Sequence, residues 1–243
     1  MNIFLNRKRF LVTGATGAVG RAVAGSLRES GAWVAGTYAQ NESSAEELRR
    51  AGVVMLRADL GDRAQARGCV AQAIEQSGAG LDGLVYCAGN TRDRTLLKMT
   101  DAEWDDVQRV HLAGLVACVQ TALPSMQLRK QGKIIAMGSL SGKVGRVGQA
   151  NYSAAKAATT AFVKSLAREA GRFGISANVV CPGFIDSRMT RGAPPEAWER
   201  AKNESVLGAI SSVEVVASFV TWMLSDACRG VTGQLFQLDS RIA

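Results

Sequence analysis

The 243-residue sequence predicts an α/β protein made of a single domain, with a doubly wound sheet of about seven parallel strands and helices on both faces. Two features favour this fold class. Short apolar segments alternate with amphipathic segments along the chain, as they do in βαβ units with right-handed crossovers. No Gly/Ser tract, charge block or internal repeat divides the chain, and its four prolines are dispersed. One domain over residues 1–243 is therefore expected.

The first half of the chain alternates strand and helix in the order of a Rossmann fold. Apolar runs predict strands at residues 9–14, 32–38, 53–60 and 82–89. Amphipathic runs predict helices at residues 18–30, 43–52 and about 62–77. The middle helix begins at a serine, which can cap the first N–H groups, and stops at a glycine.

The second half continues the alternation and adds one irregular segment. The expected elements are a long helix from about Asp101 past Leu115, a strand at 132–139, a helix at 148–169, a strand at 175–183, a helix from Ser212 and a strand at 233–239. A polar stretch at about 184–210 contains Trp198 and the adjacent Pro194 and Pro195. We expect this stretch to form a lid that shapes a substrate pocket.

Composition limits the partners of the protein. The chain carries 29 Lys and Arg against 21 Asp and Glu, a net charge of +8, which favours an anionic partner such as a nucleotide, phosphopantetheine or an acidic protein. Its basic residues are scattered without aromatic residues between them, so nucleic acid is not the expected partner. Five isolated cysteines and a single histidine offer no metal-ligand spacing, and no metal site is predicted.

The ends and the apolar segments predict a cytoplasmic protein with reduced thiols. The N-terminal ten residues lack the apolar core and cleavage site of a signal peptide. No segment approaches the roughly 18 uncharged apolar residues of a membrane span, so no membrane association is expected.

A glycine-rich turn follows the first predicted strand. Residues 13–20 read TGATGAVG, with Gly14, Gly17 and Gly20 at the start of a helix. Glycines allow the backbone N–H groups of this turn to approach a pyrophosphate at the positive end of the helix dipole. The turn therefore predicts a dinucleotide site; the alternative is a tight strand-to-helix turn that binds nothing.

The end of the second strand favours NADP(H) over NAD(H). An NAD site usually has a carboxylate there to bind the ribose diol, whereas this chain has Thr37 between Gly36 and Tyr38. Without that carboxylate, a 2′-phosphate is not repelled. Asp59, after the third strand, could bind the adenine amino group or could simply cap a turn.

Tyr152 and Lys156 stand four residues apart in the helix at 148–169 and so share one face. A cation beside a phenol favours phenolate and is expected to lower the pKa of the tyrosine, which could then exchange protons near neutral pH. Ser139 lies at the carboxyl end of its strand, the edge where open α/β sheets bind ligands. These three residues predict a catalytic group.

The pattern S-x12-Y-x3-K, the loop at 13–20 and the segment at 181–190 resemble the classical short-chain dehydrogenase/reductase family. The resemblance covers essentially the whole chain. It is greatest to the 3-oxoacyl-[acyl-carrier-protein] reductases, on residues 90–107, 148–158 and 165–186.

This resemblance implies a role for each residue of the site. Tyr152 protonates the alkoxide that forms as hydride arrives from the nicotinamide, and Ser139 hydrogen-bonds the substrate carbonyl. Lys156 lowers the pKa of Tyr152 and binds the nicotinamide ribose. The implied cofactor-binding residues are Thr13, Gly14, Thr16, Gly17, Val19, Gly20, Thr37, Asp59, Leu60, Cys87, Ala88, Gly89, Tyr152, Lys156, Pro182, Gly183 and Ile185.

The chain departs from the family pattern at several of these positions. Ala18 replaces the middle glycine of the loop, and Gly17 occupies a place where NADP-preferring relatives often carry a basic residue. Cys87 replaces an asparagine beside the cofactor. His111 replaces the active-site asparagine and could either join the proton relay or be a packed core histidine, since Trp104, Val107 and Leu115 lie at helical spacing from it.

The predicted function is NADPH-dependent reduction of a carrier-bound 3-oxoacyl thioester in fatty-acid or polyketide-like biosynthesis. One alternative is a carbonyl reductase or secondary-alcohol dehydrogenase for a small free substrate. Another is a weakly active nucleotide-binding subunit beside an active homologue. The resemblance implies a homodimer or homotetramer, and it makes Arg129, Lys130 and Arg172 candidates for docking an acidic carrier protein.

Overall fold

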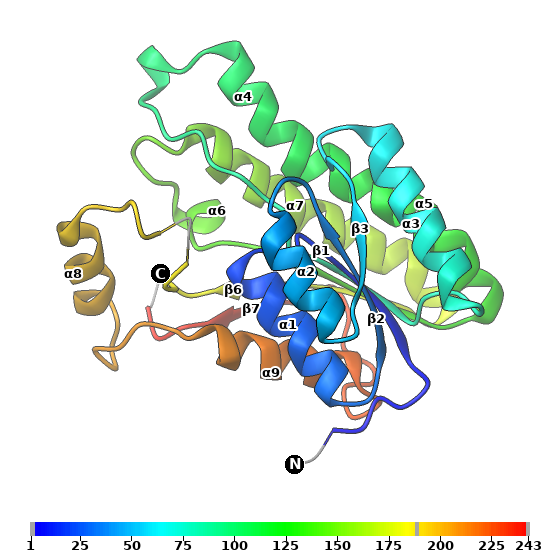
Figure 1. Cartoon of the computed structure of the whole chain (residues 1–243). Coiled ribbons are helices and arrows are strands. Elements are labelled where there is room, and N and C mark those ends of the chain that lie inside the picture. The colour runs from blue at the N-terminus through cyan, green and yellow to red at the C-terminus, as the bar shows by residue number, and fades with distance from the viewer. Residues whose placement is uncertain (1–2, 188–189, 242–243) are drawn as a thin grey trace.

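The computed structural model describes residues 3–187 and 190–241 and contains one parallel sheet with helices on both faces (Figure 1). The sheet has the seven strands that the sequence predicts, in the order β3-β2-β1-β4-β5-β6-β7. They are β1 (Arg9–Thr13), β2 (Trp33–Tyr38), β3 (Val54–Arg57), β4 (Gly83–Tyr86), β5 (Gly132–Met137), β6 (Ile175–Pro182) and β7 (Leu235–Leu238). The order reverses between β1 and β4, which creates the crevice where such sheets bind nucleotides.

The helices form two layers, each with its own apolar core. The α-helices are α1 (Ala18–Glu29), α2 (Glu42–Arg50), α3 (Arg63–Ser77), α4 (Asp101–Gln108), α5 (Gly114–Arg129), α6 (Ser141–Val144), α7 (Ala150–Ala170), α8 (Pro195–Asn203) and α9 (Val213–Leu224). Helices α1, α2 and α9 pack on one face of the sheet, and α3, α5 and α7 pack on the other. Successive residues of β1 alternate between these cores: Leu11 joins one, and Phe10 and Val12 join the other. The predicted fold class is confirmed.

The predicted long helix from Asp101 is interrupted. A π-helical turn, η2 (Arg109–Ala113), joins α4 to α5 and contains His111. The Tyr86 hydroxyl donates a hydrogen bond of 2.6 Å to the Val110 carbonyl in this turn, and so satisfies a backbone oxygen. Such π-turns often occur at functional sites. The sequence pattern did not predict this one, because helical spacing of apolar residues continues through it.

The predicted lid is partly helical. Pro195 opens α8, where its missing N–H costs no hydrogen bond, and Trp198 packs edge-on against Phe184 with ring centroids 4.9 Å apart. Helix α8 stands away from the sheet, near α6 and the C-terminus (Figure 1). Residues 188 and 189 of the predicted lid lie outside the described residues.

The C-terminal tail, residues 239–241, holds the far end of the lid. The Ser205 and Ser240 hydroxyl oxygens lie 2.6 Å apart, and the backbone N–H of Val206 donates to the Ser240 carbonyl. This contact joins segments that lie 35 residues apart in the sequence.

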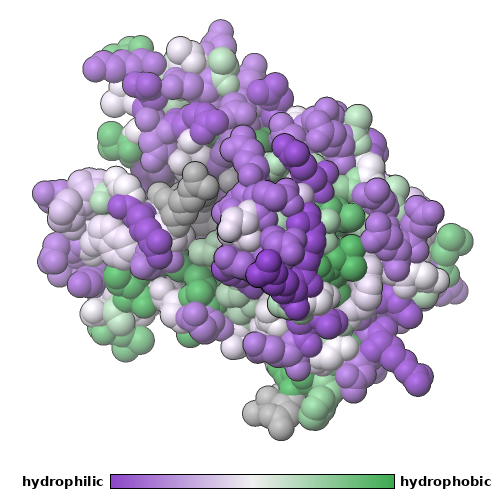
Figure 2. All heavy atoms as spheres, viewed as in Figure 1, coloured by the Kyte–Doolittle hydropathy of each residue, from purple (hydrophilic) through white to green (hydrophobic). Residues whose placement is uncertain are grey.

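The face of the molecule in Figure 2 is covered mainly by hydrophilic residues, with apolar groups exposed only in patches. Of the helices that the structure describes, none is both long enough and apolar enough to span a membrane. Further apolar side chains, such as Leu97, Leu128 and Val147, are almost fully exposed.

Candidate active site

A cavity of about 1150 Å³ opens at the carboxyl edge of the sheet, between the ends of β4, β5 and β6 and helix α8. Ser139, Tyr152 and Lys156 all line it, together with His111. Val144, Val147 and Phe184 add apolar wall, and Pro194 and Ala197 extend this wall onto the lid. The structure thus brings the predicted catalytic residues into one pocket, at the edge of the sheet that the sequence indicated.

The nucleotide loop is held by contacts that only glycine permits. Gly14 has φ +61°, a conformation that L side chains rarely adopt, and a Cβ there would lie 2.8 Å from the Ala88 Cα. A Cβ at Gly20 would lie 2.3 Å from the Gly14 carbonyl oxygen. The Thr13 hydroxyl accepts hydrogen bonds from the backbone N–H groups of Cys87 (3.1 Å) and Ala88 (3.2 Å). The loops after β1 and β4 are therefore fastened together on the two sides of the crevice.

The first turn of α1 fits a dinucleotide pyrophosphate. Gly17 is its N-cap and supplies no side-chain cap, and no acidic residue occupies the first turn. The free N–H groups there would receive phosphate oxygens at the positive end of the helix dipole. Thr16 is partly exposed beside this turn. Ala18 is the first residue of α1, where alanine is compatible with the helix, so this departure leaves the cradle intact.

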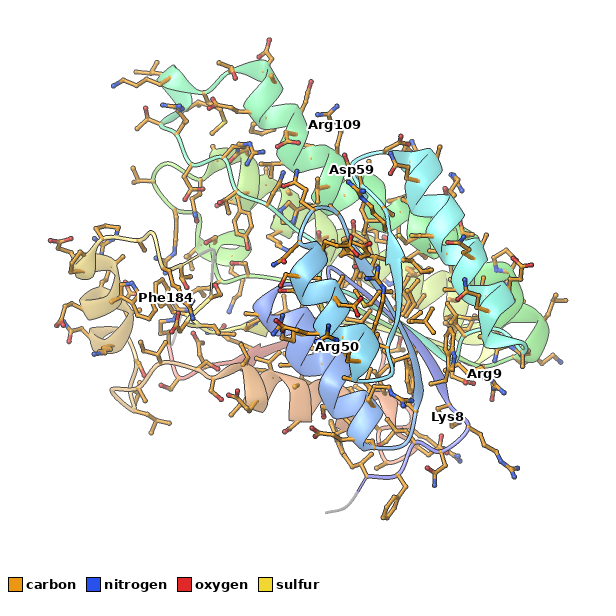
Figure 3. The ribbon with its side chains drawn as sticks, in the orientation of Figure 1. Lys8, Arg9, Arg50, Asp59, Arg109 and Phe184 are labelled. Carbon is orange, nitrogen blue, oxygen red and sulfur yellow. The ribbon has the colours of Figure 1, made fainter. Side chains whose placement is uncertain are left out.

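Three predicted contacts on the adenosine side have different environments. The Thr37 side chain is 1% exposed and accepts a hydrogen bond from the Gly14 N–H (3.1 Å), so it supports the loop from beneath. Asp59 is exposed at the edge of the sheet near Arg109 (Figure 3), and its carboxylate accepts from the Gly61 N–H (2.8 Å). Leu60 is buried behind it. Asp59 therefore has the turn role and still offers a carboxylate oxygen at the surface.

A carboxylate that the sequence reasoning missed lies just beyond the end of β2. Glu42 accepts hydrogen bonds of 2.7 Å from both the Tyr38 hydroxyl and the Arg49 guanidinium. These hydrogen bonds lower the pKa of Glu42, with Arg49 the largest cause. The local charge of this carboxylate is thus compensated by a neighbouring cation, which weakens its repulsion of a phosphate.

Lys156, the predicted catalytic lysine, lies against the ring of Tyr152. Lys156 is buried, and its Nζ donates a 2.7 Å hydrogen bond to the Met137 carbonyl at the end of β5. The same Nζ lies 5.6 Å from the centroid of the Tyr152 ring. Ser139 follows β5, and its hydroxyl accepts a hydrogen bond from the Ser141 N–H (3.2 Å).

The pKa of Tyr152 differs from the sequence expectation. Burial raises it to about 12, and a hydrogen bond with Ser139 offsets only part of this rise. Burial lowers the pKa of Lys156 to about 8. The expected lowering of the tyrosine pKa is not found, because desolvation of the phenolate outweighs a lysine that is placed at the ring rather than at the hydroxyl. Tyr152 therefore keeps its proton at neutral pH, whereas Lys156, with a pKa of about 8, titrates about one pH unit above neutrality.

His111 combines the two interpretations that the sequence left open. Its side chain is 2% exposed, and its Nε2 lies 2.8 Å from the carbonyl oxygen and 3.1 Å from the nitrogen of Asn90. The imidazole also meets the Tyr152 ring edge-on, with centroids 5.2 Å apart, and lines the pocket. Its Nδ1 is buried without a partner among the described residues. His111 is thus packed and hydrogen-bonded, but inside the pocket.

The His111 imidazole is neutral. Burial, and then the charge of Lys156, lowers its pKa to about 3. The titration near neutral pH that is usual for histidine is therefore absent at this position.

The remaining cofactor positions line the crevice and the adjoining cavity. Cys87 and Val19 face the cavity, and burial raises the pKa of the Cys87 thiol to about 12, so it stays protonated. Gly89 packs against the imidazole, since a Cβ there would lie 2.5 Å from the His111 Cε1. Pro182, at the end of β6, and Gly183 and Ile185, in the loop after it, also line the cavity.

The three predicted docking cations lie at the amino-terminal ends of the strands, opposite to the carboxyl ends where the cavity opens. Arg129 and Lys130 precede β5, and Arg172 precedes β6, whereas the cavity follows the carboxyl ends of both strands. The six residues of β5 span about 20 Å. Arg129 pairs with Asp82 (3.3 Å), and Arg172 lies over the Phe173 ring. None of the three lines the cavity of its own chain.

The sequence reasoning missed three arginines that line the cavity: Arg146, Arg200 and Arg241. They come from the loop after α6, from α8 and from the C-terminal tail. No local motif marks them, because only the folded lid and tail bring these segments together.

Known proteins resemble this chain over nearly its full length. A family model described as enoyl-(acyl carrier protein) reductase matches residues 14–240. A Staphylococcus aureus (strain Mu50) protein named 3-oxoacyl-[acyl-carrier-protein] reductase FabG is 37% identical over 238 residues, 96% of both chains. A Vibrio cholerae serotype O1 protein of the same name is 34% identical over 245 residues, 97% of both chains. The crystal structure titled gox2181 has a TM-score of 0.91 and 31% identity, and the match covers 98% of this chain and 96% of that one.

Proposed function

Since this chain belongs to the short-chain dehydrogenase/reductase family of oxidoreductases, we propose that it reduces a 3-oxoacyl thioester to the 3-hydroxyacyl thioester with NADPH. The observation that carries the proposal is the placement of Ser139, Tyr152 and Lys156 in one cavity beside the nucleotide crevice. The names of the curated relatives support this choice of substrate.

Each of the three residues has a separate role in the proposed reaction. When bound in the crevice, a reduced nicotinamide would supply the hydride that adds to the substrate carbonyl carbon. Ser139 donates a hydrogen bond to the carbonyl oxygen, and Tyr152 transfers its proton to that oxygen as negative charge develops there. Lys156 in its charged form stabilises the phenolate that remains. A proton from solvent then restores Tyr152.

The chemistry of Ser139 supports a carbonyl substrate. Its hydroxyl can hydrogen-bond a carbonyl oxygen, whereas a carbon–carbon double bond offers no such acceptor. The family model is named for enoyl reduction, so an enoyl thioester is the natural control substrate. The apolar wall of Val144, Val147 and Phe184 suits the acyl chain.

NADPH is the proposed cofactor because no uncompensated carboxylate follows β2. Glu42, the nearest acidic residue along the chain, is already bound by Arg49 and Tyr38. A carrier-bound substrate and a homodimer or homotetramer are further parts of the proposal, and they rest on the likeness to the relatives.

The test is an assay of purified protein with NADPH, and separately with NADH, on acetoacetyl thioesters of coenzyme A and of an acyl carrier protein. We expect loss of reduced nicotinamide, faster with NADPH and with the carrier-bound substrate. A crotonyl thioester should not react. If NADPH binds but neither acetoacetyl thioester is reduced, the proposal fails, and either a small free carbonyl substrate or a nucleotide-binding subunit becomes the better account.

A further inference from the structure

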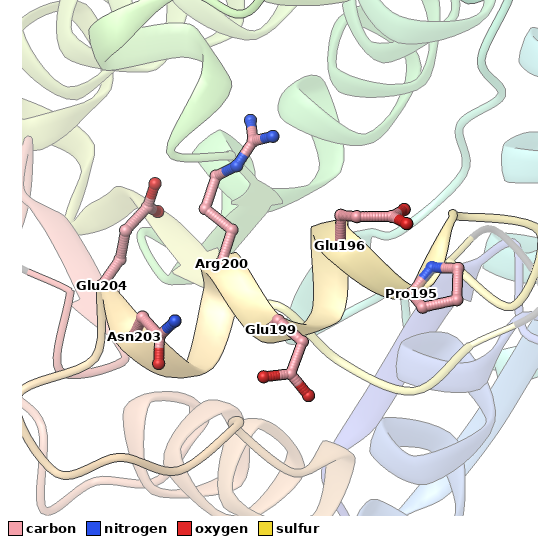
Figure 4. A pocket seen from close by; sticks show the side chains of 6 residues that line it. All are labelled: Pro195, Glu196, Glu199, Arg200, Asn203 and Glu204. Carbon is pink, nitrogen blue, oxygen red and sulfur yellow. The ribbon is translucent and has the colours of Figure 1, made fainter.

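Two arginine side chains flank the opening of the catalytic cavity from different elements. Arg146 lies in the loop between α6 and α7, and Arg200 lies on the lid helix α8. A second hollow of about 550 Å³ lies over α8 and shares Arg200 and Glu204 with the cavity (Figure 4). Arg200 is exposed and the Arg146 side chain is 31% exposed, so both lie where the cavity meets solvent.

The guanidinium groups at this opening have few partners. Among the residues that the structure describes, the Arg146 guanidinium pairs only with the Glu204 carboxylate, at 3.7 Å, which is longer than a hydrogen bond. Within residues 3–187 and 190–241, Arg200 has no ion pair and no side-chain hydrogen bond. In Figure 4, Arg200 and Glu204 extend to the same side of α8 and Glu199 to the other. Most of the N–H donors at the opening are thus available to a ligand.

The other cations of the cavity are already engaged. Lys156 is buried beneath Tyr152, at the inner end of the cavity. Arg241 is paired with Asp239 at 2.5 Å, and their side chains are 7% and 5% exposed. Asp93 and Glu204 are the carboxylates among the lining residues, against four cations. The cavity thus has more cationic than anionic side chains. The cations with free N–H donors, Arg146 and Arg200, lie at its opening.

We propose that Arg146 and Arg200 bind the phosphoryl group of the arm that carries the acyl thioester. The inference rests on the proposed function, because a thioester at Tyr152 must extend its arm out through this opening. A pantetheine arm ends in a phosphoryl group, both on a carrier protein and in coenzyme A. Guanidinium forks from two sides match phosphate oxygens in geometry and charge.

The Glu204 carboxylate should oppose this binding, so its removal should change the KM in the direction opposite to removal of either arginine. Its carboxylate holds Arg146 and would repel a phosphate at the same place. Glu204→Gln should therefore lower the KM for a substrate with a phosphoryl group, while Arg146→Ala and Arg200→Ala raise it.

The experiment compares three acetoacetyl thioesters: those of an acyl carrier protein, of coenzyme A, and of N-acetylcysteamine, which lacks the phosphoryl group. Arg200→Ala and Arg146→Ala should each raise the KM of the first two roughly tenfold and leave that of the third unchanged. Equal effects on the carrier and coenzyme A substrates indicate the pantetheine phosphate; an effect on the coenzyme A substrate alone indicates its nucleotide phosphates. Arg191→Ala is the matched control, since Arg191 is an exposed lid arginine that pairs with Asp186 outside the cavity.

A binding measurement separates failure of this inference from failure of the proposed function. Pantetheine 4′-phosphate and pantetheine are each titrated into the NADPH-saturated protein. The phosphorylated compound should bind more tightly, and Arg200→Ala should remove the difference, whether or not any thioester is reduced. Equal affinity for the two compounds, or a KM that rises equally for all three thioesters, overturns the inference.

Discussion

The nucleotide end and the substrate end of this protein are built in different ways. At the nucleotide end, the residues that shape the crevice are glycines and small side chains packed against backbone, as Gly14 is against Ala88. At the substrate end, the cavity is lined by polar and charged side chains such as Tyr152, Arg200 and Arg241, which come from distant parts of the chain. Substitutions that add a side chain should therefore weaken nucleotide binding at the first region. Substitutions that remove a polar group should weaken substrate binding or turnover at the second.

The largest effect is expected from removal of the proton donor. Tyr152→Phe deletes the hydroxyl that we propose as the proton donor and leaves the ring beside His111 in place. Turnover of an acetoacetyl thioester should fall by roughly a thousandfold or more, because general acid catalysis typically contributes factors of that order. Steady-state kinetics measure the loss, and an unchanged circular dichroism spectrum controls for folding. Activity within tenfold of the original protein would contradict the role of Tyr152.

An added methyl group should break the nucleotide end. Gly14→Ala places a Cβ within 2.8 Å of the Ala88 backbone in a left-handed conformation. We expect a loss of NADPH affinity of at least tenfold and a loss of about 1–3 kcal/mol in the free energy of unfolding. Fluorescence titration and chemical denaturation measure the two quantities. Gly25→Ala is the matched control, since a Cβ there meets nothing within 4 Å.

The pH dependence of reduction should follow Lys156. Its pKa of about 8 lies below the ordinary value of 10.5, so its charge is present below about pH 8 and is lost as pH rises through that value. The rate of reduction should therefore decline above about pH 8. Tyr152, with a pKa of about 12, adds no change at lower pH. A profile of kcat/KM against pH that stays flat from pH 7 to about 10 would show that the charge of Lys156 is not needed.

The smallest effect concerns His111. Because its pKa is about 3, it adds no step to the pH profile near neutrality. His111→Asn introduces the residue that the family resemblance implies at this position, and it should change kcat by less than about fivefold, with the shape of the profile unchanged. His111→Leu removes the contact with Asn90, the residue after Gly89 in the proposed cofactor loop, and should therefore lower NADPH affinity. A fall of a hundredfold in kcat for His111→Asn would instead show that the imidazole itself takes part in proton transfer.

Sequence alone predicted the strand, loop and helix of the proposed nucleotide end, because their determinants are local. The strand β1, the glycine loop and α1 follow one another within about twenty residues, and each has its own pattern. The placement of Ser139, Tyr152 and Lys156 in one pocket also follows from the topology of a parallel sheet.

The rest of the site depends on tertiary structure. The sign of the pKa shift at Tyr152 depends on burial, which the spacing of a helix does not show. The π-turn at His111 depends on the Tyr86 hydroxyl from another element. The position of Arg200 at the opening depends on how the lid folds over the cavity, and the distance of Arg129 from the cavity depends on the direction of β5.

The most direct test of this contrast is the affinity of Tyr152→Phe for NADPH, measured by fluorescence titration beside its turnover. If the nucleotide end and the substrate end are built separately, the dissociation constant should stay within about threefold of that of the original protein, since the loss of one hydrogen bond changes affinity only modestly. Turnover should be almost abolished in the same preparation. A loss of NADPH affinity as large as that of Gly14→Ala would contradict the account, because it would show that one side chain of the substrate end holds the nucleotide.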